Sequence, residues 1–533
     1  MPDFSRGSDL PGEPTSPWLA KTLESAPSDP TERRSERFDH DPLSTDRSVD
    51  VAVIGGGIAG LSTAIEGRKR GQSVAVLERD HVAAGTTGKS TAKLTSQHGL
   101  IYDHLRREFG RRQAHQYAQV QEDAIDTVER RVDELDVDCG FERHPSYLYS
   151  NEPDEIRREA DAAQAAGLEA TYVTSVPPFE RAQAAVRFEE QAWFDPRSYL
   201  LAIAAELAAD DGAGIYEGTR VTDVEPGSPP RVHTREATVT ARKVVLATGF
   251  PLLDRAGYFA RMHPKRSYVL GIRLDGDPPE GMYYRSGDNY RSVRTHRDDD
   301  GELLLVGGED HKTGQGSPTG ERYRRLERWA RNRFPVDEIA YSWSTQDYVT
   351  ADKVPFVGRA GPRAENVLVA TGFRGWGMTN GVAAGRALAE RIAGGKPQAR
   401  ELFSPLRFTP KTSLADTLTE NADAVSQFAT DWARTLLASD LESLDPGEGT
   451  VVRRGGKPIA CARDDDGELH TTSAVCTHMY CLVEWNDAER SWDCPCHGSR
   501  FSLEGERLEG PATEDLSTQG STPERPPRRD SDW

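Results

Sequence analysis

The chain has 533 residues, too many for one ordinary domain, and 36% of them are hydrophobic, which is enough for substantial cores. No apolar run approaches the length of a membrane-spanning helix, and the first residues lack the layout of a signal peptide, so we expect a cytoplasmic protein without a transmembrane segment. The formal net charge of −20 argues against nucleic acid as a partner, because nucleic acid binds basic surfaces. The acidic, lysine-poor composition is similar to that of salt-adapted proteins.

Residues 1–47 are rich in Pro, Ser, Asp and Glu and show no periodicity, so we expect a flexible arm. Trp18 and Leu19 of this arm are expected to pack back against the folded protein. From Asp50 the pattern changes to a strand, a helix and a second strand, at 50–55, 58–70 and 73–78. This βαβ opening predicts an α/β domain with a parallel sheet. Further helices are expected near 103–136, 153–167 and 198–209, and short strands between 170 and 350. A strand within residues 367–381 is expected to lead into a helix ending near Ile392.

A glycine motif follows the first strand directly. Gly55, Gly57 and Gly60 form G-x-G-x-x-G, which permits a tight turn, a close approach of a pyrophosphate and close packing of helix on strand. Glu78 ends the second strand, where it can bind ribose hydroxyls. The motif predicts a dinucleotide site, which also includes Ile58, Ala59 and Arg79. NAD and FAD share this fingerprint, so the motif alone does not choose between them.

Four further segments resemble the D-amino-acid-oxidase-like (glycine/sarcosine oxidase) family of FAD enzymes, over residues 50–395. They are GTTGKSTAKLTSQHGLIY (85–102), VVLATG (244–249), WSTQDYVTADKVPFVGR (343–359) and VLVATGFRGWGMTNG (367–381). The resemblance implies FAD, a Rossmann-type FAD-binding domain at 48–410 and an inserted antiparallel-sheet substrate domain at about 170–350. It also implies contacts to FAD from Val221, Thr248, Gly249, Gly372, Gly375, Trp376, Gly377 and Met378, with Val221 at the adenine. Lys93 is a candidate contact to the flavin phosphate or the pyrimidine ring, and the alternative is that it faces solvent.

The catalytic residues are less well defined, because hydride transfer to a flavin needs no protein nucleophile. His98 is a candidate acid–base group or flavin attachment point, and a hydrogen-bonded structural histidine is the alternative. In HPKRSYVLGI (263–272), Arg266 or Tyr268 is a candidate for the substrate carboxylate, as arginines are in this family, although surface basic residues are common.

A second motif lies near the C-terminus. Cys476, His478, Cys494 and His497 give the pattern C-x-H-x15-C-x-x-H. Two thiolates and two imidazoles suit a Rieske [2Fe–2S] centre, and Cys₂His₂ also suits a tetrahedral structural zinc site. Each ligand loop carries one additional cysteine, Cys481 or Cys496.

The sequence CTHMYC…WDCPCHGSRF…GPA (476–512) resembles the Rieske domains of respiratory-chain and related proteins, over about residues 441–517. The resemblance implies an all-β domain, a [2Fe–2S] cluster held by the four motif residues, and a disulfide between Cys481 and Cys496. Tyr480 departs from that pattern by replacing a glycine, and Phe501 stands where those proteins often have a tyrosine.

Residues 411–440 are predicted to form a helical connector and residues 518–533 a disordered tail. We expect an FAD-dependent oxidoreductase that oxidises a small-molecule amine or amino acid and passes electrons singly through the cluster to an acceptor protein or a quinone-linked chain. The tether would keep both centres close without any strong docking surface. Two alternatives stay open: a reductase or oxygenase whose cluster feeds the flavin, and an oxygen-using oxidase with a structural or redox-sensing Rieske module.

Overall fold

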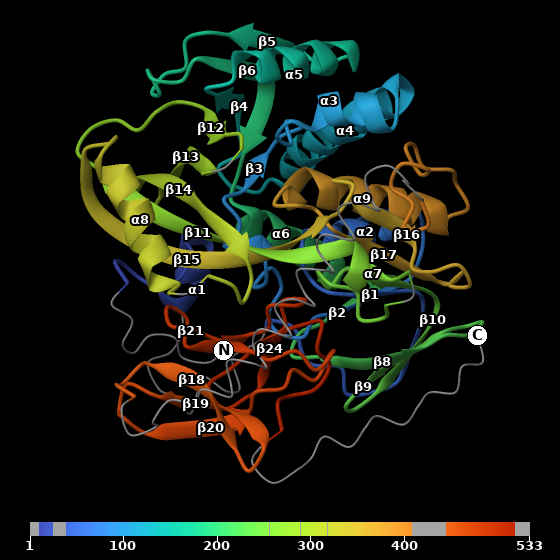
Figure 1. The fold of residues 1–533 in the computed structure, drawn as a ribbon. Helices are drawn as coiled ribbons and strands as arrows, with labels where there is room; N and C mark the ends of the chain where they lie inside the picture. Colours follow the sequence, from blue (N-terminus) through green and yellow to red (C-terminus); the bar gives the residue numbers. More distant parts are fainter. Residues whose placement is uncertain are drawn as a thin grey trace.

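The computed structural model describes residues 10–24, 39–254, 256–287, 289–316, 318–407 and 444–517. Two large sheets form a main body from residues 39–407, and two small sheets form a C-terminal domain from residues 444–517 (Figure 1). The predicted connector and tail lie outside the described residues. None of the helices in the described part of the chain is both long and apolar enough to cross a membrane.

The first sheet has eight strands and contains the predicted βαβ unit. Its order is β16-β17-β10-β1-β2-β7, and β8 and β9 form a hairpin beside β10. The bounds are β1 (Arg47–Ile54), β2 (Val74–Leu77), β7 (Ala213–Tyr216), β8 (Val221–Glu225), β9 (Arg231–Thr234), β10 (Thr238–Leu246), β16 (Phe356–Arg359) and β17 (Val367–Thr371). The strands β17, β10, β1, β2 and β7 run parallel. Residues 51–54 of β1, 74–77 of β2 and 244–246 of β10 are apolar and buried, because both faces of such a sheet are covered.

Two helices pack closely against each other beside this sheet. They are α2 (Ile58–Arg68) and α9 (Gly377–Ile392). A Cβ atom on Gly381 would lie 2.6 Å from Cγ2 of Ile58, and one on Gly385 would lie 2.5 Å from Cβ of Ser62. Glycine at these positions therefore allows the start of α9 to reach the start of α2, where the glycine motif lies.

The second sheet has nine strands and is mostly antiparallel. Its order is β15-β11-β14-β13-β12-β4-β6-β3, and β5 pairs with β6. The bounds are β3 (Lys93–Leu94), β4 (Glu142–Ser150), β5 (Ala170–Val173), β6 (Ala184–Trp193), β11 (Met262–Leu274), β12 (Met282–Arg285), β13 (Arg291–Asp298), β14 (Gly301–Lys312) and β15 (Val336–Thr350). Because β3 and β4 precede residue 170, this sheet uses an earlier part of the chain than the sequence indicates.

The helices largely follow the predicted pattern. The segment expected near 103–136 forms two helices, α3 (Ile101–Glu108) and α4 (Arg111–Leu135), because Gly110 between them takes a φ of +86°. The others in the main body are η2 (Thr87–Lys89), α5 (Pro153–Ala165), α6 (Pro196–Ala208), α7 (Tyr258–Arg261) and α8 (Gly320–Arg331).

Part of the predicted N-terminal arm is packed against the main body. Helix α1 (Pro17–Glu24) buries Trp18 completely and Leu19 nearly so. The indole Nε1 of Trp18 donates a hydrogen bond to the carbonyl oxygen of Ser90 at 2.8 Å, and its ring lies 4.3 Å from that of His296. Residues 1–9 and 25–38 of the arm lie outside the described residues.

The C-terminal domain consists of one three-stranded and one four-stranded antiparallel sheet. The strands are β18 (Gly449–Arg454), β19 (Lys457–Arg463), β20 (Leu469–Ser473), β21 (Glu484–Asn486), β22 (Ser491–Asp493), β23 (Arg500–Phe501) and β24 (Arg507–Glu509). Trp492, Phe501 and the four cysteines of the predicted loops form its core. In Figure 1 this domain, in orange and red, lies below the sheet that contains β11 and β15.

Candidate functional site

The glycine motif forms a turn that only glycine permits. Gly55 takes a φ of +109°, and a Cβ atom there would lie 2.4 Å from the carbonyl oxygen of Ala247. A Cβ atom on Gly60 would lie 1.9 Å from the carbonyl oxygen of Gly55. At Gly57 the nearest described atom to a Cβ would be Oγ1 of Thr87, at 3.1 Å. Helix α2 begins next to Gly57, which has no side chain to cap it. Oγ1 of Thr87 accepts a hydrogen bond from the N–H of Ile58 at 3.2 Å, and the next N–H groups of the first turn can bind a pyrophosphate.

Glu78 lies at the position expected for a ribose-binding carboxylate, directly after β2. Its Oε2 accepts a hydrogen bond from the backbone N–H of Gly56 at 2.6 Å, and its Oε1 accepts one from Asp80 at 2.9 Å. Burial raises the pKa of this carboxyl above its ordinary value. Arg79 pairs with Asp80, and Val221 is buried at the start of β8. Ile58 and Ala59 are buried in the first turn of α2.

The predicted flavin loop, residues 372–376, is attached to strand β15. Gly372 and Gly375 take φ values of +76° and +81°, and a Cβ atom on Gly372 would lie 2.4 Å from Cγ2 of Thr350. The N–H of Gly375 donates to the carboxylate of Asp347, and the N–H of Arg374 donates to the carbonyl oxygen of Tyr348 at 3.2 Å. Gly377 starts α9, and Met378 beside it is buried.

His98 is fully buried and hydrogen-bonded through both ring nitrogens. Its Nε2 lies 2.7 Å from the carbonyl oxygen of Thr95, an acceptor, so Nε2 carries the proton. Its Nδ1 therefore accepts from the hydroxyl of Tyr117 at 2.6 Å. Burial lowers the pKa of His98 to about 3, so the ring is neutral at physiological pH. The ring stacks on Trp376, with 5.2 Å between centroids.

Three further predicted FAD contacts lie on two other segments, β3 and the turn after β10. Lys93 is buried on β3 and donates from Nζ to Oγ1 of Thr91 at 2.9 Å. Burial, and to a smaller extent the charge of Arg294, lowers its pKa to about 7. Thr248 donates from Oγ1 to the carbonyl oxygen of Phe250 at 2.6 Å, and Gly249 between them takes a φ of +73°.

The four predicted cluster ligands meet in the C-terminal domain. Cys476 and Cys494 are buried free thiols, and the rings of His478 and His497 lie 4.9 Å apart at 88°. Among the described residues, the buried Nδ1 atoms of both histidines have no hydrogen-bond partner. Two available thiols and two unpartnered imidazole nitrogens match the donor set of a Rieske [2Fe–2S] centre.

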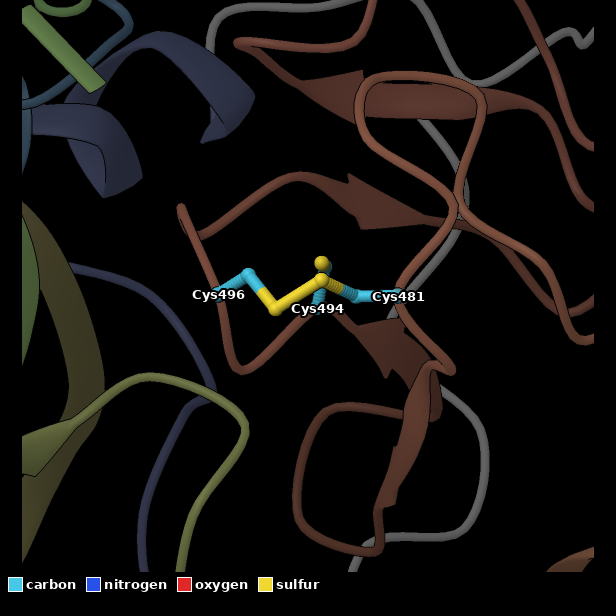
Figure 2. A group of neighbouring side chains, drawn as sticks. All are labelled: Cys481, Cys494 and Cys496. Atoms are coloured by element: carbon cyan, nitrogen blue, oxygen red, sulfur yellow. A yellow bond between two sulfur atoms is a disulfide. The ribbon is translucent and has the colours of Figure 1, made fainter. Parts of the chain in front are cut away.

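A disulfide lies beside these residues and joins Cys481 to Cys496, the pair that the resemblance implies, with 6.5 Å between Cα atoms (Figure 2). The sulfur atoms of Cys481, Cys494 and Cys496 lie within 4.8 Å of one another. Only Cys494 of the three can supply a thiolate, because the other two sulfurs are bonded together. Tyr480, in place of the expected glycine, takes a φ of +61°, a left-handed conformation that glycine adopts more easily.

Arg266 and Tyr268 are buried on β11 and contact other partners than His98 does. The guanidinium of Arg266 contacts the carboxylate of Glu489 in the C-terminal domain, and the hydroxyl of Tyr268 lies 3.0 Å from Nε2 of His311. Strand register places Arg266 opposite Gln346 on β15, and Gln346 also bonds to the C-terminal domain. The structure therefore brings Arg266 to the domain interface.

The C-terminal domain turns its two motif histidines toward the main body. The ring of His478 lies 6.2 Å from that of Phe250, and the ring of His497 lies 6.0 Å from that of Phe259. The two domains are therefore in contact, whereas the sequence led us to expect a tether that needs no strong docking surface. Sequence reasoning missed Phe250 and Phe259, because a contact between distant segments leaves no local pattern; Phe250 adjoins the predicted Gly249.

Comparison with known proteins agrees with both sites. The family model "FAD dependent oxidoreductase" (DAO) matches residues 50–391, and the model "Rieske [2Fe-2S] domain" matches residues 431–519. YhfW of Bacillus subtilis, named as a Rieske 2Fe-2S iron–sulfur protein, is 38% identical over 486 residues, covering 89% of this chain and 94% of YhfW.

Two more distant proteins resemble the main body. Gamma-glutamylputrescine oxidoreductase of Escherichia coli is 23% identical over 66% of this chain and 86% of its own. The crystal structure of glycine oxidase from Geobacillus kaustophilus superimposes with a TM-score of 0.56 at 20% identity, covering 68% of this chain and 99% of its own. The expected fold class and both cofactors, FAD and a [2Fe–2S] cluster, are confirmed. The chain belongs to the DAO family of FAD-dependent oxidoreductases and carries a C-terminal Rieske [2Fe–2S] domain.

Proposed function

We propose that the protein oxidises an amine or amino acid at the flavin and passes the electrons, one at a time, through the Rieske domain to an external one-electron acceptor. The substrate class is supported by relatives named as a gamma-glutamylputrescine oxidoreductase and a glycine oxidase. The position of the Rieske domain supports electron exchange with the flavin, because its two motif histidines face Phe250 and Phe259 of the oxidoreductase domain. The outward direction follows from the substrate class, since substrate oxidation makes the flavin the site where electrons enter.

Bound FAD supplies a two-electron hydride acceptor, and the cluster supplies a one-electron carrier. Each substrate molecule therefore loses two electrons and requires two turnovers of the cluster, each delivering one electron to the acceptor, while the protons leave to solvent. Because the external acceptor takes both electrons, the reaction needs no oxygen. A one-electron carrier placed between the flavin and a one-electron acceptor gives the second domain a function.

The chain's own residues shape the flavin site. The first turn of α2 orients the pyrophosphate, and Glu78 offers a carboxylate to the ribose. His98 is neutral and bonded on both sides, so it orients Trp376 by stacking and does not exchange a proton during turnover. Asp347 holds the flavin loop at Gly375.

The test is an anaerobic screen of amines and amino acids with the holoprotein, followed by visible absorption and electron paramagnetic resonance. We expect an active substrate to bleach the flavin and to reduce the cluster in the same experiment. Oxygen consumption with a cluster that stays oxidised would favour an oxidase with a structural or redox-sensing Rieske module. Flavin reduction only after an external reductase has reduced the cluster would favour the reductase or oxygenase alternative.

A further inference from the structure

Five charged side chains meet at the boundary between the two domains, and we call them the interdomain charge cluster. Its members are Arg266 from β11 and Glu489, Asp493, Arg500 and Glu509 from the Rieske domain. Arg500 lies 2.6 Å from Glu489, 2.9 Å from Asp493 and 3.0 Å from Glu509. Arg266 binds Glu489 through both Nε and Nη2, and its side chain is 1% exposed.

Because its side chains are buried, the interdomain charge cluster strongly favours the observed position of the Rieske domain. An arginine side chain that is removed from water needs its carboxylate partner, because an unpaired buried charge is costly. If the Rieske domain moved away, Arg266 would lose Glu489, its partner from that domain. Ser344 on the neighbouring strand β15 also donates to Glu489, so two strands of the sheet contact the same carboxylate.

A second set of contacts joins the Rieske domain to the start of helix α8. The carboxylate of Asp487 accepts hydrogen bonds from the N–H groups of Thr319 at 2.6 Å and Gly320 at 3.2 Å. A carboxylate at this position caps the helix and interacts favourably with its dipole. The adjacent Gly314 approaches the backbone of Pro495 so closely that a Cβ atom would lie 2.6 Å from its nitrogen.

The docked position brings strand β15 between the flavin loop and the cluster loops. The backbone of Tyr348 accepts a hydrogen bond from the flavin loop, and its hydroxyl donates to the carbonyl oxygen of Gly510 at 3.0 Å. Gln346 donates from Nε2 to the carbonyl oxygen of Gly498, next to His497, at 2.8 Å. Aromatic rings continue the contact: Tyr348 lies 5.3 Å from Phe250, which lies 6.2 Å from His478.

We propose that the interdomain charge cluster holds the Rieske domain permanently in the electron-transfer position, and that Tyr348 and Phe250 bridge the flavin loop to His478. The inference deepens and rests on the proposed function. In this arrangement electrons would pass from the flavin to the Rieske [2Fe–2S] cluster without any domain movement. Arg266 acts as a positioning residue.

Hydrogen exchange tests the docking without reference to activity. The Thr319 N–H is bonded across the boundary, so it exchanges when the domains separate. Truncating one partner of a buried charge pair weakens an interface by about 2 kcal/mol or more, so Arg266→Met should speed this exchange at least about 30-fold. Glu489→Gln, which keeps the side-chain shape, should act in the same direction.

Arg407→Met is the matched control. It breaks another buried pair, Arg407 with Asp352 at 2.6 Å, inside the oxidoreductase domain. We expect it to leave exchange at Thr319 unchanged. Exchange within about twofold of the wild type in both Arg266→Met and Glu489→Gln would overturn the docking proposal. Glu489→Gln alone decides if Arg266→Met does not fold.

Transfer kinetics test the fixed geometry in the wild-type holoprotein. After rapid anaerobic reduction of the flavin, we expect the rate of cluster reduction to be independent of added sucrose, because no domain has to diffuse. A rate that falls in proportion to solvent viscosity would overturn the fixed geometry. A cluster that the flavin never reduces would instead refute the proposed function, and the exchange experiment would still decide whether the domains are held together.

Discussion

Replacing Ser499 by alanine should lower the reduction potential of the cluster. Ser499 is fully buried, and its Oγ accepts a hydrogen bond from the N–H of Ala512 at 2.9 Å. The hydroxyl proton of Ser499 is therefore available for a second hydrogen bond, in which Ser499 is the donor. The N–H of Cys494 donates to the carbonyl oxygen of Ser499 at 2.8 Å, which places Ser499 beside the second ligand loop. Hydrogen bonding from Cys494 and Ser499 lowers the pKa of the Cys476 thiol.

The size of the effect follows from the charge change on reduction. A hydrogen bond to a charged group contributes about 1.5–3 kcal/mol, and it strengthens when the cluster gains one electron. A strengthening of about 1 kcal/mol corresponds to about 40 mV, because 59 mV is about 1.4 kcal/mol for a one-electron couple. We therefore expect Ser499→Ala to lower the potential by about 40 mV.

Protein-film voltammetry measures this shift, and electron paramagnetic resonance verifies that the cluster is intact. Ser502→Ala is the matched control, because Ser502 is also buried but its hydroxyl bonds to Glu504 at 2.9 Å. A potential in Ser499→Ala that agrees with the wild type within about 10 mV would show that the hydroxyl does not bond to the ligand sulfur.

Four further outcomes are expected. Each purified chain should carry one FAD, two irons and two acid-labile sulfides, because both cofactor motifs are complete; one zinc without sulfide would contradict the cluster. Gly57→Val should abolish FAD binding and keep the cluster signal, because its side chain enters the pyrophosphate space; loss of the cluster signal as well would contradict the separation of the two sites. Phe501→Tyr should raise the potential, by tens of millivolts if the new hydroxyl reaches a sulfur, and voltammetry without any shift would show that it does not. Burial alone would raise the pKa of Glu489, but the charges of Arg266 and Arg500 outweigh burial and lower that pKa. The contribution of Glu489 to stability is therefore complete above the ordinary Glu pKa of about 4.3, and it is lost as the pH falls below that value. Wild-type thermal stability should therefore decrease more than that of Glu489→Gln between pH 6 and pH 3, and parallel decreases would contradict this assignment.

Both cofactor sites could be predicted from the sequence because each is built from a short segment. The glycines of the first motif lie within six residues and adopt their turn through local backbone contacts, such as the close approach of Gly60 to Gly55. Cys476 and His478 share one loop, and Cys494 and His497 share the other. In such segments the spacing already determines which side chains can meet.

The relation between the two sites was decided only by the tertiary structure. Arg266 and Glu489 are 223 residues apart. In the sequence, neither residue differs from an ordinary charged surface residue, and only the packing of the two domains pairs them. Successive side chains of β15 alternate between two sides, so that Asp347 contacts the flavin loop and Gln346 contacts the cluster loop. Which loop each side chain meets depends on how the domains pack around the strand. Long-range contacts of this kind depend on packing over the whole chain, so local spacing carries no signal of them.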